Sequence, residues 1–476
     1  MMTDREIRDS KPRSDLQTVG YRPRVVVKFQ DGVKIPYEDG AEQHFDKLNI
    51  GPWHQLRDQF PGIRLRRLFT SATPEKIGSL VDEAMRRDRS YKAPNFLTYF
   101  VIDLPAEVQS NALVASLLKW EKVQTAYFDP PGSDPAVDPS NDPRRINQGY
   151  LDPAPIGIDA EFAWGVTGGD GAGQDFIDLE QGWTTNHVDL IAHGATLLHG
   201  TIRDSSRAHG TSVLGEICAA DNTIGCIGIA PNLASVNLVS YWSSIRPDAI
   251  MAAIVKLTCG GTLGGVLLLE AQVDVTVGSA EWTGLPIEVL DAEFDTIRLA
   301  TALGIVVVEA AGNGGNDLDT FADAGGNLLL NRGSSSFRDS VAVMVGAATS
   351  SLPHRPFSLG AGNFGSRVDC YAWGENVDTT SSSGLPPYST TAYTDGPAKF
   401  GGTSAAAAII AGAALALQGI AQAKLGHRFD GSQMRALLGD PATGTASDVP
   451  PNDRIGVMPN LRAIIESSAS GLAPSV

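Results

Sequence analysis

Cysteine and positive charge are both scarce in this sequence. The 476 residues include 4 cysteines, and no C-x-x-C pair occurs, which argues against a zinc or thiol-redox motif. We expect the cysteines to be buried free thiols, with a pairing of Cys218 and Cys226 left open by their closeness in sequence. Lysine and arginine number 37 against 54 acidic residues, a net charge of −17. Such a chain lacks a basic footprint, so we expect no nucleic-acid partner.

A long apolar segment is also missing. The N-terminus is charged and has no apolar core, so it does not read as a secretory signal. The longest apolar run, residues 405–417, is too short and too rich in Ala and Gly to cross a bilayer. We therefore expect no membrane partner, and the compartment stays open.

The chain is long enough for two or three domains at about 100–200 residues each. Residues 1–20 are polar and are expected to be disordered. Residues 21–130 follow the order β-α-β-α-β, which predicts a small α+β domain of the split βαβ, ferredoxin-like type. Its expected strands are 24–29, 96–104 and 123–128, and its expected helices start at 74 and cover 112–120.

The remaining residues divide into a linker and a larger domain. Residues 131–149 are rich in Pro, Asp and Ser, which predicts an exposed linker and a processing region. From 150 to 470, short apolar strands alternate with helices. This alternation predicts an α/β domain with a parallel sheet between two helical layers, a three-layer αβα architecture. Active sites in such sheets form at the carboxyl ends of the strands.

Ser404 lies in the run Gly401-Gly402-Thr403-Ser404, directly before a helix of small apolar residues. Glycines allow a sharp turn and leave room beside the hydroxyl. The free N–H groups and the positive dipole end of the helix would face this serine, as a nucleophile requires. The same residues also fit a plain N-cap, and this run alone leaves both interpretations open.

A serine nucleophile needs a base and a group that orients the base. His199 and His209 are both followed by Gly-Thr, but only His209 begins a helix with small residues at packing positions, so we favour His209. The orienting carboxylate should end a strand. Asp178 fits this better than Asp175, which would lie inside the strand; a simple β-turn Asp is the alternative.

Asn313 follows a buried strand and stands between glycines. Its side chain could donate a hydrogen bond to an oxyanion, with the backbone N–H of Ser404 as the second donor. Taken alone, Asn313 is better explained as a turn residue that tolerates positive φ.

Together these four segments resemble the subtilisin family of serine peptidases (family S8). In that family an Asp, a His in His-Gly-Thr, an Asn after a strand and a Ser in Gly-Thr-Ser occur in this order. Asp178, His209, Asn313 and Ser404 keep the order, and residues 228–231, 363–369 and 433–438 match flanking family segments. The resemblance covers roughly residues 150–465. It implies a serine endopeptidase with a catalytic Asp178–His209–Ser404 triad and Asn313 in the oxyanion hole.

The resemblance also implies partners and metals. Residues 21–130 would be an inhibitory propeptide, so the expected partners are protein or peptide substrates and the chain's own propeptide in a zymogen. Chemistry would need no cofactor. Structural calcium is frequent in the family, and Asn316, Asp317, Asp319 and Asp323 offer oxygen ligands, with a solvated acidic loop as the alternative. The substrate-binding residues would be Leu269, Glu270, Ala271, Ala310, Ala311 and Gly312.

Two departures from the family pattern stand out. Asp178 is followed by about two residues more than usual before Gly182. Glu270 stands in the substrate-binding strand where the family has Ser-Leu-Gly. A rim or salt-bridged Glu is the favoured interpretation; a carboxylate in the specificity pocket, the alternative, would favour a basic residue before the cut bond. The rival functions are a catalytically inactive subtilisin-like binding protein and an esterase. The chain lacks the Gly-x-Ser-x-Gly elbow of the esterases around Ser404.

Overall fold

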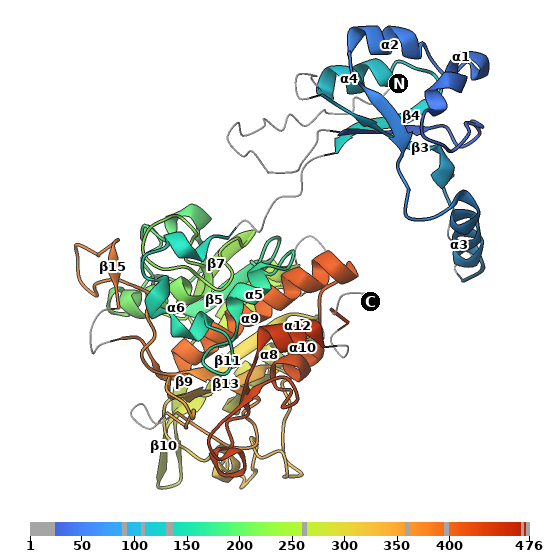
Figure 1. Cartoon of the computed structure of the whole chain (residues 1–476). Helices are drawn as coiled ribbons and strands as arrows, with labels where there is room; N and C mark the ends of the chain where they lie inside the picture. Colours follow the sequence, from blue (N-terminus) through green and yellow to red (C-terminus); the bar gives the residue numbers. More distant parts are fainter. Residues whose placement is uncertain are drawn as a thin grey trace. The chain divides into compact units, whose positions relative to one another are not determined.

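The computed structural model describes residues 24–87, 93–105, 110–129, 137–258, 264–357, 362–394, 399–467 and 471–472. The chain divides into two compact units, Met1–Asp134 and Pro135–Val476 (Figure 1). The predicted disorder of residues 1–20 lies outside the described residues.

The first unit is built on a four-stranded antiparallel sheet in the order β2-β3-β1-β4. This is the strand order of the split βαβ, ferredoxin-like arrangement expected from the sequence. A separate apolar core includes Phe29, Phe45 and Phe100, whose rings meet edge to face. The sequence did not predict β2, α1 or α2. The elements are β1 Arg24–Phe29, α1 Phe45–Leu48, α2 Trp53–Gln59, β2 Arg64–Arg67, α3 Pro74–Arg87, β3 Tyr99–Asp103, α4 Ser110–Leu117 and β4 Val123–Asp129.

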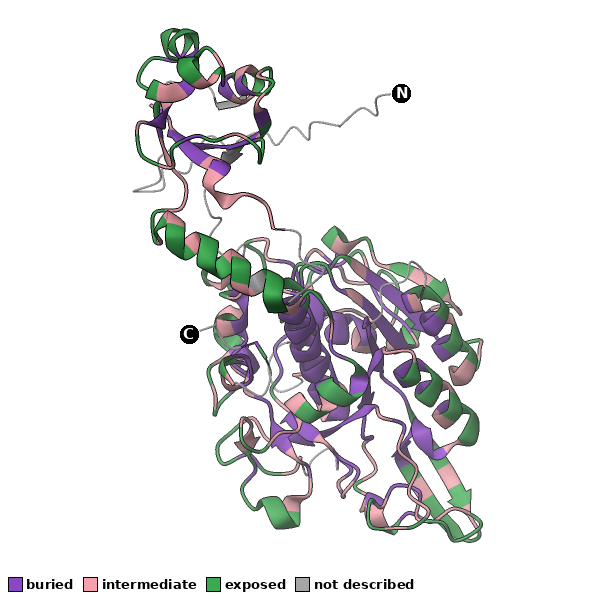
Figure 2. Ribbon diagram, turned by 90° about the vertical axis from the view of Figure 1, so that its right-hand side faces the viewer, coloured by how far each residue is buried: buried purple, intermediate pink, exposed green. Residues whose placement is uncertain are grey.

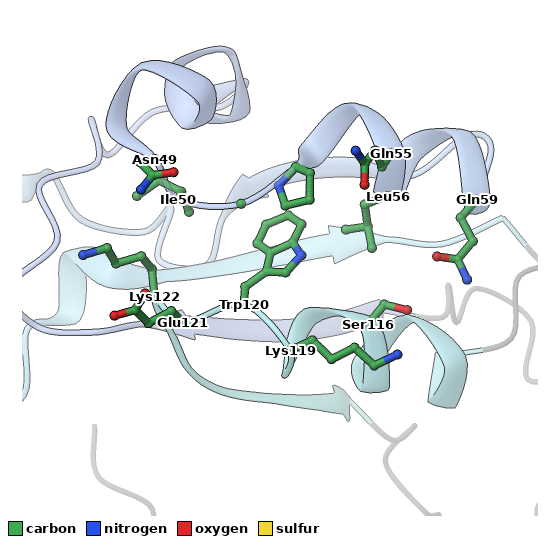
Figure 3. Close-up of a pocket in the computed structure, with 12 residues that line it drawn as sticks. Asn49, Ile50, Gln55, Leu56, Gln59, Ser116, Lys119, Trp120, Glu121 and Lys122 are labelled. Atoms are coloured by element: carbon green, nitrogen blue, oxygen red, sulfur yellow. The ribbon is translucent and has the colours of Figure 1, made fainter.

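Trp120 fixes the packing between α2 and the turn that follows α4 (Figure 3). Its indole lies against Gly51, where a Cβ atom would come within 2.2 Å of the ring. A cavity of about 480 Å³ runs beside this contact, with Gln55 and Lys119 among its lining residues. Any side chain at position 51 would therefore displace Trp120 and open this part of the unit.

The second unit is organised around a nine-stranded sheet in the order β16-β17-β13-β12-β11-β8-β5-β7-β6. Neighbouring strands are parallel from β6 to β17, and only β16 is antiparallel. The strands are β5 Asp175–Glu180, β6 Thr196–His199, β7 Ser235–Ser240, β8 Val266–Leu269, β11 Val306–Ala310, β12 Val343–Ala348, β13 Cys370–Trp373, β16 Thr445–Ala446 and β17 Val457–Met458. A hairpin of β9 Gln272–Val277 and β10 Ala280–Pro286 and a short pair, β14 Thr380–Ser381 and β15 Ala392–Tyr393, lie outside this sheet.

Helices cover the sheet as the alternating pattern predicted, which confirms the three-layer α/β architecture. Helices α6, Arg207–Cys218, and α9, Gly402–Leu425, pack against each other, and α9 also contacts β8, β11, β12 and β13. Helices α7, Arg246–Thr258, and α8, Asp291–Ala302, form a second packed pair, with exposed outer faces. Smaller helices complete the unit: α5 Ala160–Trp164, α10 Gly431–Leu438, α11 Pro450–Asp453 and α12 Leu461–Glu466.

Helix α9 is the centre of the core, and Figure 2 shows it buried along most of its length. Its 24 residues are long and apolar enough to cross a membrane, but 94% of its most apolar segment is buried inside the unit. Close packing explains its small residues. At Gly419, for example, a Cβ atom would lie 2.0 Å from the carbonyl oxygen of Gly168.

Residues 138–149 differ from the exposed linker that the sequence predicted. Arg144 forms a two-pronged ion pair with Asp378, with both N···O distances at 2.7 Å. Gln148 is buried and donates from Nε2 to the carbonyl oxygen of Ile227 at 2.8 Å. The backbone N–H of Asp138 donates to Asp221 at 2.7 Å. This stretch is therefore part of the second unit.

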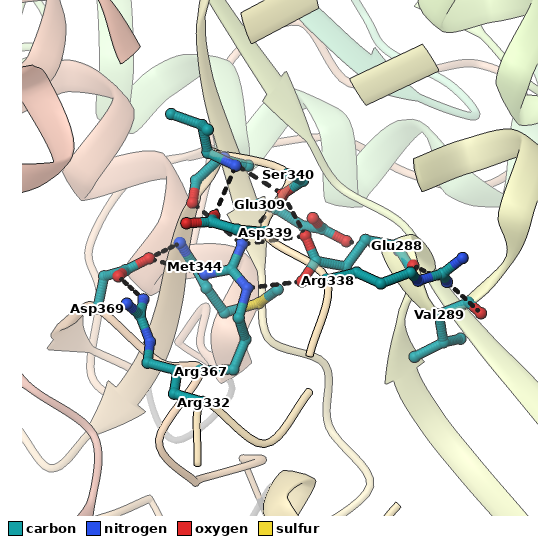
Figure 4. A network of polar contacts seen from close by, with 12 residues as sticks. Glu288, Val289, Glu309, Arg332, Arg338, Asp339, Ser340, Met344, Arg367 and Asp369 are labelled. Atoms are coloured by element: carbon teal, nitrogen blue, oxygen red, sulfur yellow. Dashed lines mark hydrogen bonds and ion pairs between the residues drawn. The ribbon is translucent and has the colours of Figure 1, made fainter. Parts of the chain in front are cut away.

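A buried ion network joins β11 to the segments that flank β12 and β13 (Figure 4). Arg367 is 0% exposed and donates to both carboxylate oxygens of Glu288, at 2.6 and 3.0 Å. It also bonds to Asp369 at 2.9 Å. Glu309 accepts from the backbone N–H of Glu288 at 3.1 Å, and burial together with the charge of Glu288 raises the pKa of Glu309 well above its usual range.

Candidate active site

Ser404 is the third residue of α9, at the carboxyl edge of the sheet. The turn into the helix depends on Gly402, whose φ is +82°, a conformation that residues with a side chain rarely adopt. The N–H groups of the first helical turn have no partner within the helix, and the positive end of the helix dipole lies at the same place. The Gly-Gly-Thr-Ser run therefore presents the hydroxyl, as the sequence suggested.

His209 faces Ser404 from the first turn of α6. Its Nε2 atom lies 3.1 Å from Oγ of Ser404. The imidazole is held by Phe400, whose ring meets it edge to face with centroids 5.2 Å apart. His199, the weaker candidate from the sequence, instead contacts Ser244 and Asp248 at the end of β6.

Glu180, and not Asp178, contacts the other nitrogen of His209. Glu180 is the last residue of β5, and its Oε2 atom forms the hydrogen bond with Nδ1 of His209. Asp178 is fully buried and accepts a hydrogen bond from Trp183 Nε1 at 2.7 Å. The structure therefore corrects the assignment of Asp178 as the orienting carboxylate. Asp175, the other candidate, bonds to Ser235.

The sequence did contain a signal for Glu180. Glu180-Gln181-Gly182 has the acid–x–Gly spacing of the family motif, with Glu in place of Asp. Counting from Asp178 instead makes the turn two residues too long, which is the departure noted above. The longer side chain of Glu reaches His209 from the same strand end.

The carboxylates around His209 change its protonation. Desolvation alone would lower the pKa of His209, but the charge and hydrogen bond of Glu180, followed by Glu270 and Asp178, raise it to about 9. Desolvation is the largest single influence on this pKa, but the carboxylates acting together outweigh it. The pKa of Asp178 is also raised, well above its usual range, by burial and then by the charge of Glu180. Burial therefore favours the protonated, neutral form of Asp178.

Asn313 lies beside Ser404, after β11. Its Oδ1 atom accepts hydrogen bonds from the backbone N–H and the hydroxyl of Thr403, at 2.9 and 3.2 Å. These bonds fix the orientation of the amide, so that Nδ2 points away from Thr403 and lies 3.5 Å from Oε1 of Gln272. A donor amide is therefore held at the cavity that Ser404 also lines.

These groups line a cavity of about 370 Å³. Four of the expected substrate-binding residues are part of the lining: Glu270, Ala271, Ala310 and Gly312. Leu269 and Ala311 are not, because both are fully buried in the core. No sequence pattern indicated the other lining residues, namely Gln181, Arg203, Ser205, Ser206, Tyr241 and Gln272.

Comparison with known proteins identifies the family. The model of the subtilase family (Peptidase_S8) matches residues 180–457, more than half of the chain. The chain belongs to the subtilase family. The match begins at Glu180, the residue that contacts His209.

Relatives named as proteases agree with this assignment. The chain is 28% identical over 371 residues to an alkaline protease of Alkalihalobacillus alcalophilus, covering 73% of this chain and 85% of the relative. It is 29% identical over 248 residues to subtilisin Savinase of Lederbergia lenta, covering 51% of this chain and 76% of the relative. A solved structure of proteases from Pseudoalteromonas arctica PAMC 21717 aligns with 21% identity and a TM-score of 0.46, covering 72% of this chain and all of that chain. This subtilase is a serine endopeptidase.

The loop expected to offer calcium ligands does not fit a metal. Asp317 and Asp319 both bind the guanidinium of Arg454, at 2.7 and 2.8 Å. Asp323 accepts hydrogen bonds from Gly325 and Asn327 within its own turn. Within the described ranges, no group of three or more His, Cys, Asp or Glu side chains is arranged to hold a metal ion. Arg454 supplies the positive charge between these carboxylates.

The cysteines show no pairing where the structure describes them. Cys218, Cys226 and Cys370 are free and buried, and Cys259 lies outside the described residues. Burial raises the pKa of the Cys226 thiol well above its usual range, so it stays a neutral core side chain.

Proposed function

We propose that this subtilase cleaves peptide bonds in proteins through a Glu180–His209–Ser404 triad, and that it is made as an inhibited zymogen. The observation that carries the triad is the position of His209. One ring nitrogen contacts Glu180 and the other lies 3.1 Å from Ser404. A base held between an orienting carboxylate and a hydroxyl is the arrangement that activates a serine nucleophile.

The proposed reaction begins when Ser404 attacks a peptide carbonyl and His209 takes the hydroxyl proton at Nε2. Glu180 holds Nδ1–H, which keeps Nε2 free to accept and stabilises the imidazolium that forms. His209 then protonates the leaving amine, and a water molecule hydrolyses the acyl-enzyme with His209 again as the base.

The oxyanion of each tetrahedral intermediate would be held by two donors. One is Nδ2 of Asn313, whose orientation is fixed by Thr403. The other is the backbone N–H of Ser404 in the first turn of α9. Such preorganised donors act most strongly where charge develops in the transition state.

The zymogen part of the proposal rests on the first unit. It has its own core and sheet, and it precedes the catalytic unit in the chain. We propose that it is an inhibitory propeptide. The cut that releases it would lie before Asp138, because residues from Asp138 onward are hydrogen-bonded into the second unit.

A fluorophosphonate probe and the intact mass of the chain test the proposal together. The wild-type chain should label at Ser404 and lose its first unit by a cut before Asp138. Ser404→Ala should neither label nor process itself, and should remain at 50.2 kDa. Ser206→Ala, which removes another hydroxyl that lines the cavity, is the matched control and should do both.

A different outcome contradicts each part of the proposal. Absence of labelling in the wild-type chain would favour the inactive binding protein. Normal processing of the Ser404→Ala chain would contradict autocatalytic maturation but would not contradict the triad.

A further inference from the structure

Glu270 is a buried acid that the proposed reaction does not use. It is 4% exposed, and within the described part of the chain neither of its carboxylate oxygens has a hydrogen-bond partner of regular geometry. A buried carboxyl without partners is costly, so its retention at this place calls for a reason.

The register of the sheet places Glu270 beside Glu180. Leu179 of β5 pairs with Leu269 of β8, and the backbone N–H of Glu270 donates to the carbonyl oxygen of Leu179 at 3.0 Å. Glu180 and Glu270 are therefore lateral neighbours at the ends of adjacent parallel strands, and neighbours in register point to the same face of a sheet. Both line the cavity that contains His209 and Ser404.

Titratable groups on the elements packed around Glu270 either shift the pKa of its carboxyl or have their own pKa shifted by its charge. From α6 these are His209 and Glu216; from β5 they are Asp178 and Glu180. Tyr241, after β7, donates its hydroxyl to the backbone carbonyl of Glu270 at 3.5 Å. The remaining neighbours are Ser404 on α9 and Arg203, which lines the same cavity.

Among these neighbours, Glu270 and His209 affect each other's protonation most directly. Burial raises the pKa of Glu270 well above its usual range, and His209 is the strongest influence in the other direction. The Ser404 hydroxyl also favours the carboxylate, although its geometry falls short of a regular hydrogen bond. In turn, the charge of Glu270 is one of the causes that raise the pKa of His209.

We propose that Glu270 is a positioning residue that competes with His209 for one proton and so sets the pH at which Ser404 becomes a nucleophile. The proton resides either on His209, opposite a Glu270 carboxylate, or on Glu270, leaving Nε2 of His209 free. The two arrangements contain the same atoms and the same charge. Only the second lets His209 accept the Ser404 proton. This inference rests on the proposed triad.

The competition predicts a brake at low and neutral pH. A Glu270 carboxylate stabilises the imidazolium, so more alkaline solution is needed to free the base. Glu270→Gln removes that charge while keeping the size of the side chain. A single opposite charge at close range shifts a pKa by about 1–3 units, so the pH at which His209 becomes free should fall by about one unit or more. At a pH below both midpoints, this corresponds to roughly tenfold faster reaction per unit.

The test measures the rate of fluorophosphonate labelling and kcat/KM against pH for the wild-type chain and three variants. Glu270→Gln should move the acid limb to lower pH, and Glu270→Asp, which keeps the charge, should stay closer to wild type. Glu216→Gln is the matched control. It removes another buried, unpartnered carboxyl, on α6, whose pKa is raised by burial and by the charge of Glu270. Glu216 is not among the main influences on His209.

An unchanged acid limb in Glu270→Gln, or an equal shift in Glu216→Gln, overturns the inference. A second measurement separates this from failure of the proposed triad. In the full Ser404→Ala chain, the imidazole NMR titration of His209 should still move to lower pH on adding Glu270→Gln, whether or not the wild-type chain labels. No shift in that titration contradicts the competition directly.

Discussion

Glu180 and Asp178 lie two residues apart on one face of β5, and only Glu180 reaches His209. Asp178 lies one step deeper, where it accepts a hydrogen bond from Trp183 and where its burial favours the neutral form. Position along the strand therefore decides which acid can act: the last residue, Glu180, meets the cavity, while Asp178, two positions earlier, belongs to the core.

This pair provides a matched test of the triad. Glu180→Gln should lower kcat by about 10⁴-fold, the loss seen when the carboxylate of a serine-protease triad becomes an amide and the imidazole tautomer is wrong. Asp178→Asn should leave kcat within about tenfold, because burial already favours the neutral acid, which the amide matches in size and charge. A factor of ten in kcat corresponds to about 1.4 kcal/mol. Steady-state kinetics on a protein substrate gives both values.

The contrast between the two variants is the control. Each exchanges one carboxyl for an amide of the same size on the same strand, so general damage to β5 would affect both. A larger loss in Asp178→Asn than in Glu180→Gln would return the orienting role to Asp178.

Asn313 should contribute to turnover and little to substrate binding. Asn313→Ala removes the Nδ2 donor next to Ser404, and loss of one oxyanion donor lowers kcat by about 10²–10³-fold. Because the oxyanion exists only after attack, KM should change little. Asn232→Ala, which removes an exposed amide bonded to Asp170, is the control and should match wild type. A rise in KM at constant kcat would instead make Asn313 a ground-state binding residue.

The sequence was sufficient for the fold and for much of the site. Alternating apolar strands and helices predicted the layered α/β unit, since burying both faces of a parallel sheet leaves few other solutions. His209, Asn313 and Ser404 lie next to glycines, which indicate in the sequence that the backbone turns sharply or is closely packed at these positions. The structure brings these three residues to one cavity.

The sequence could not show how deeply each side chain lies along its strand, nor which distant residue it contacts. Strand periodicity alone does not separate Asp178 from Glu180, because both lie on one face of β5 and the end of the strand at Glu180 is seen only in the structure. Leu269 and Ala311 were expected to meet substrate, but a shift of one position along a strand turns a side chain from the cavity into the core. The prolines of residues 138–149 suggested a linker, although Arg144 finds its partner Asp378 far away in sequence.

Arg367 is expected to stabilise the catalytic unit far more than its neighbour Arg332. Arg367 is 0% exposed and its loss would leave the carboxylate of Glu288 buried without its counter-ion. Breaking a buried pair in this way costs about 3–5 kcal/mol of unfolding free energy. Arg332 bonds to Asp369 but is 36% exposed, and a pair of this kind is worth about 0–1 kcal/mol. Chemical denaturation of Arg367→Met and Arg332→Met measures the difference.

The measurement is best made on the full chain carrying Ser404→Ala, so that self-cleavage does not limit the unfolded state. The loss should appear in the transition of the catalytic unit and leave that of the first unit unchanged, because each unit has its own core. Adding Glu288→Gln to Arg367→Met should recover part of the loss, since the uncompensated charge is then removed. If the double variant is no more stable than Arg367→Met, the cost comes from lost packing around the guanidinium rather than from the stranded carboxylate.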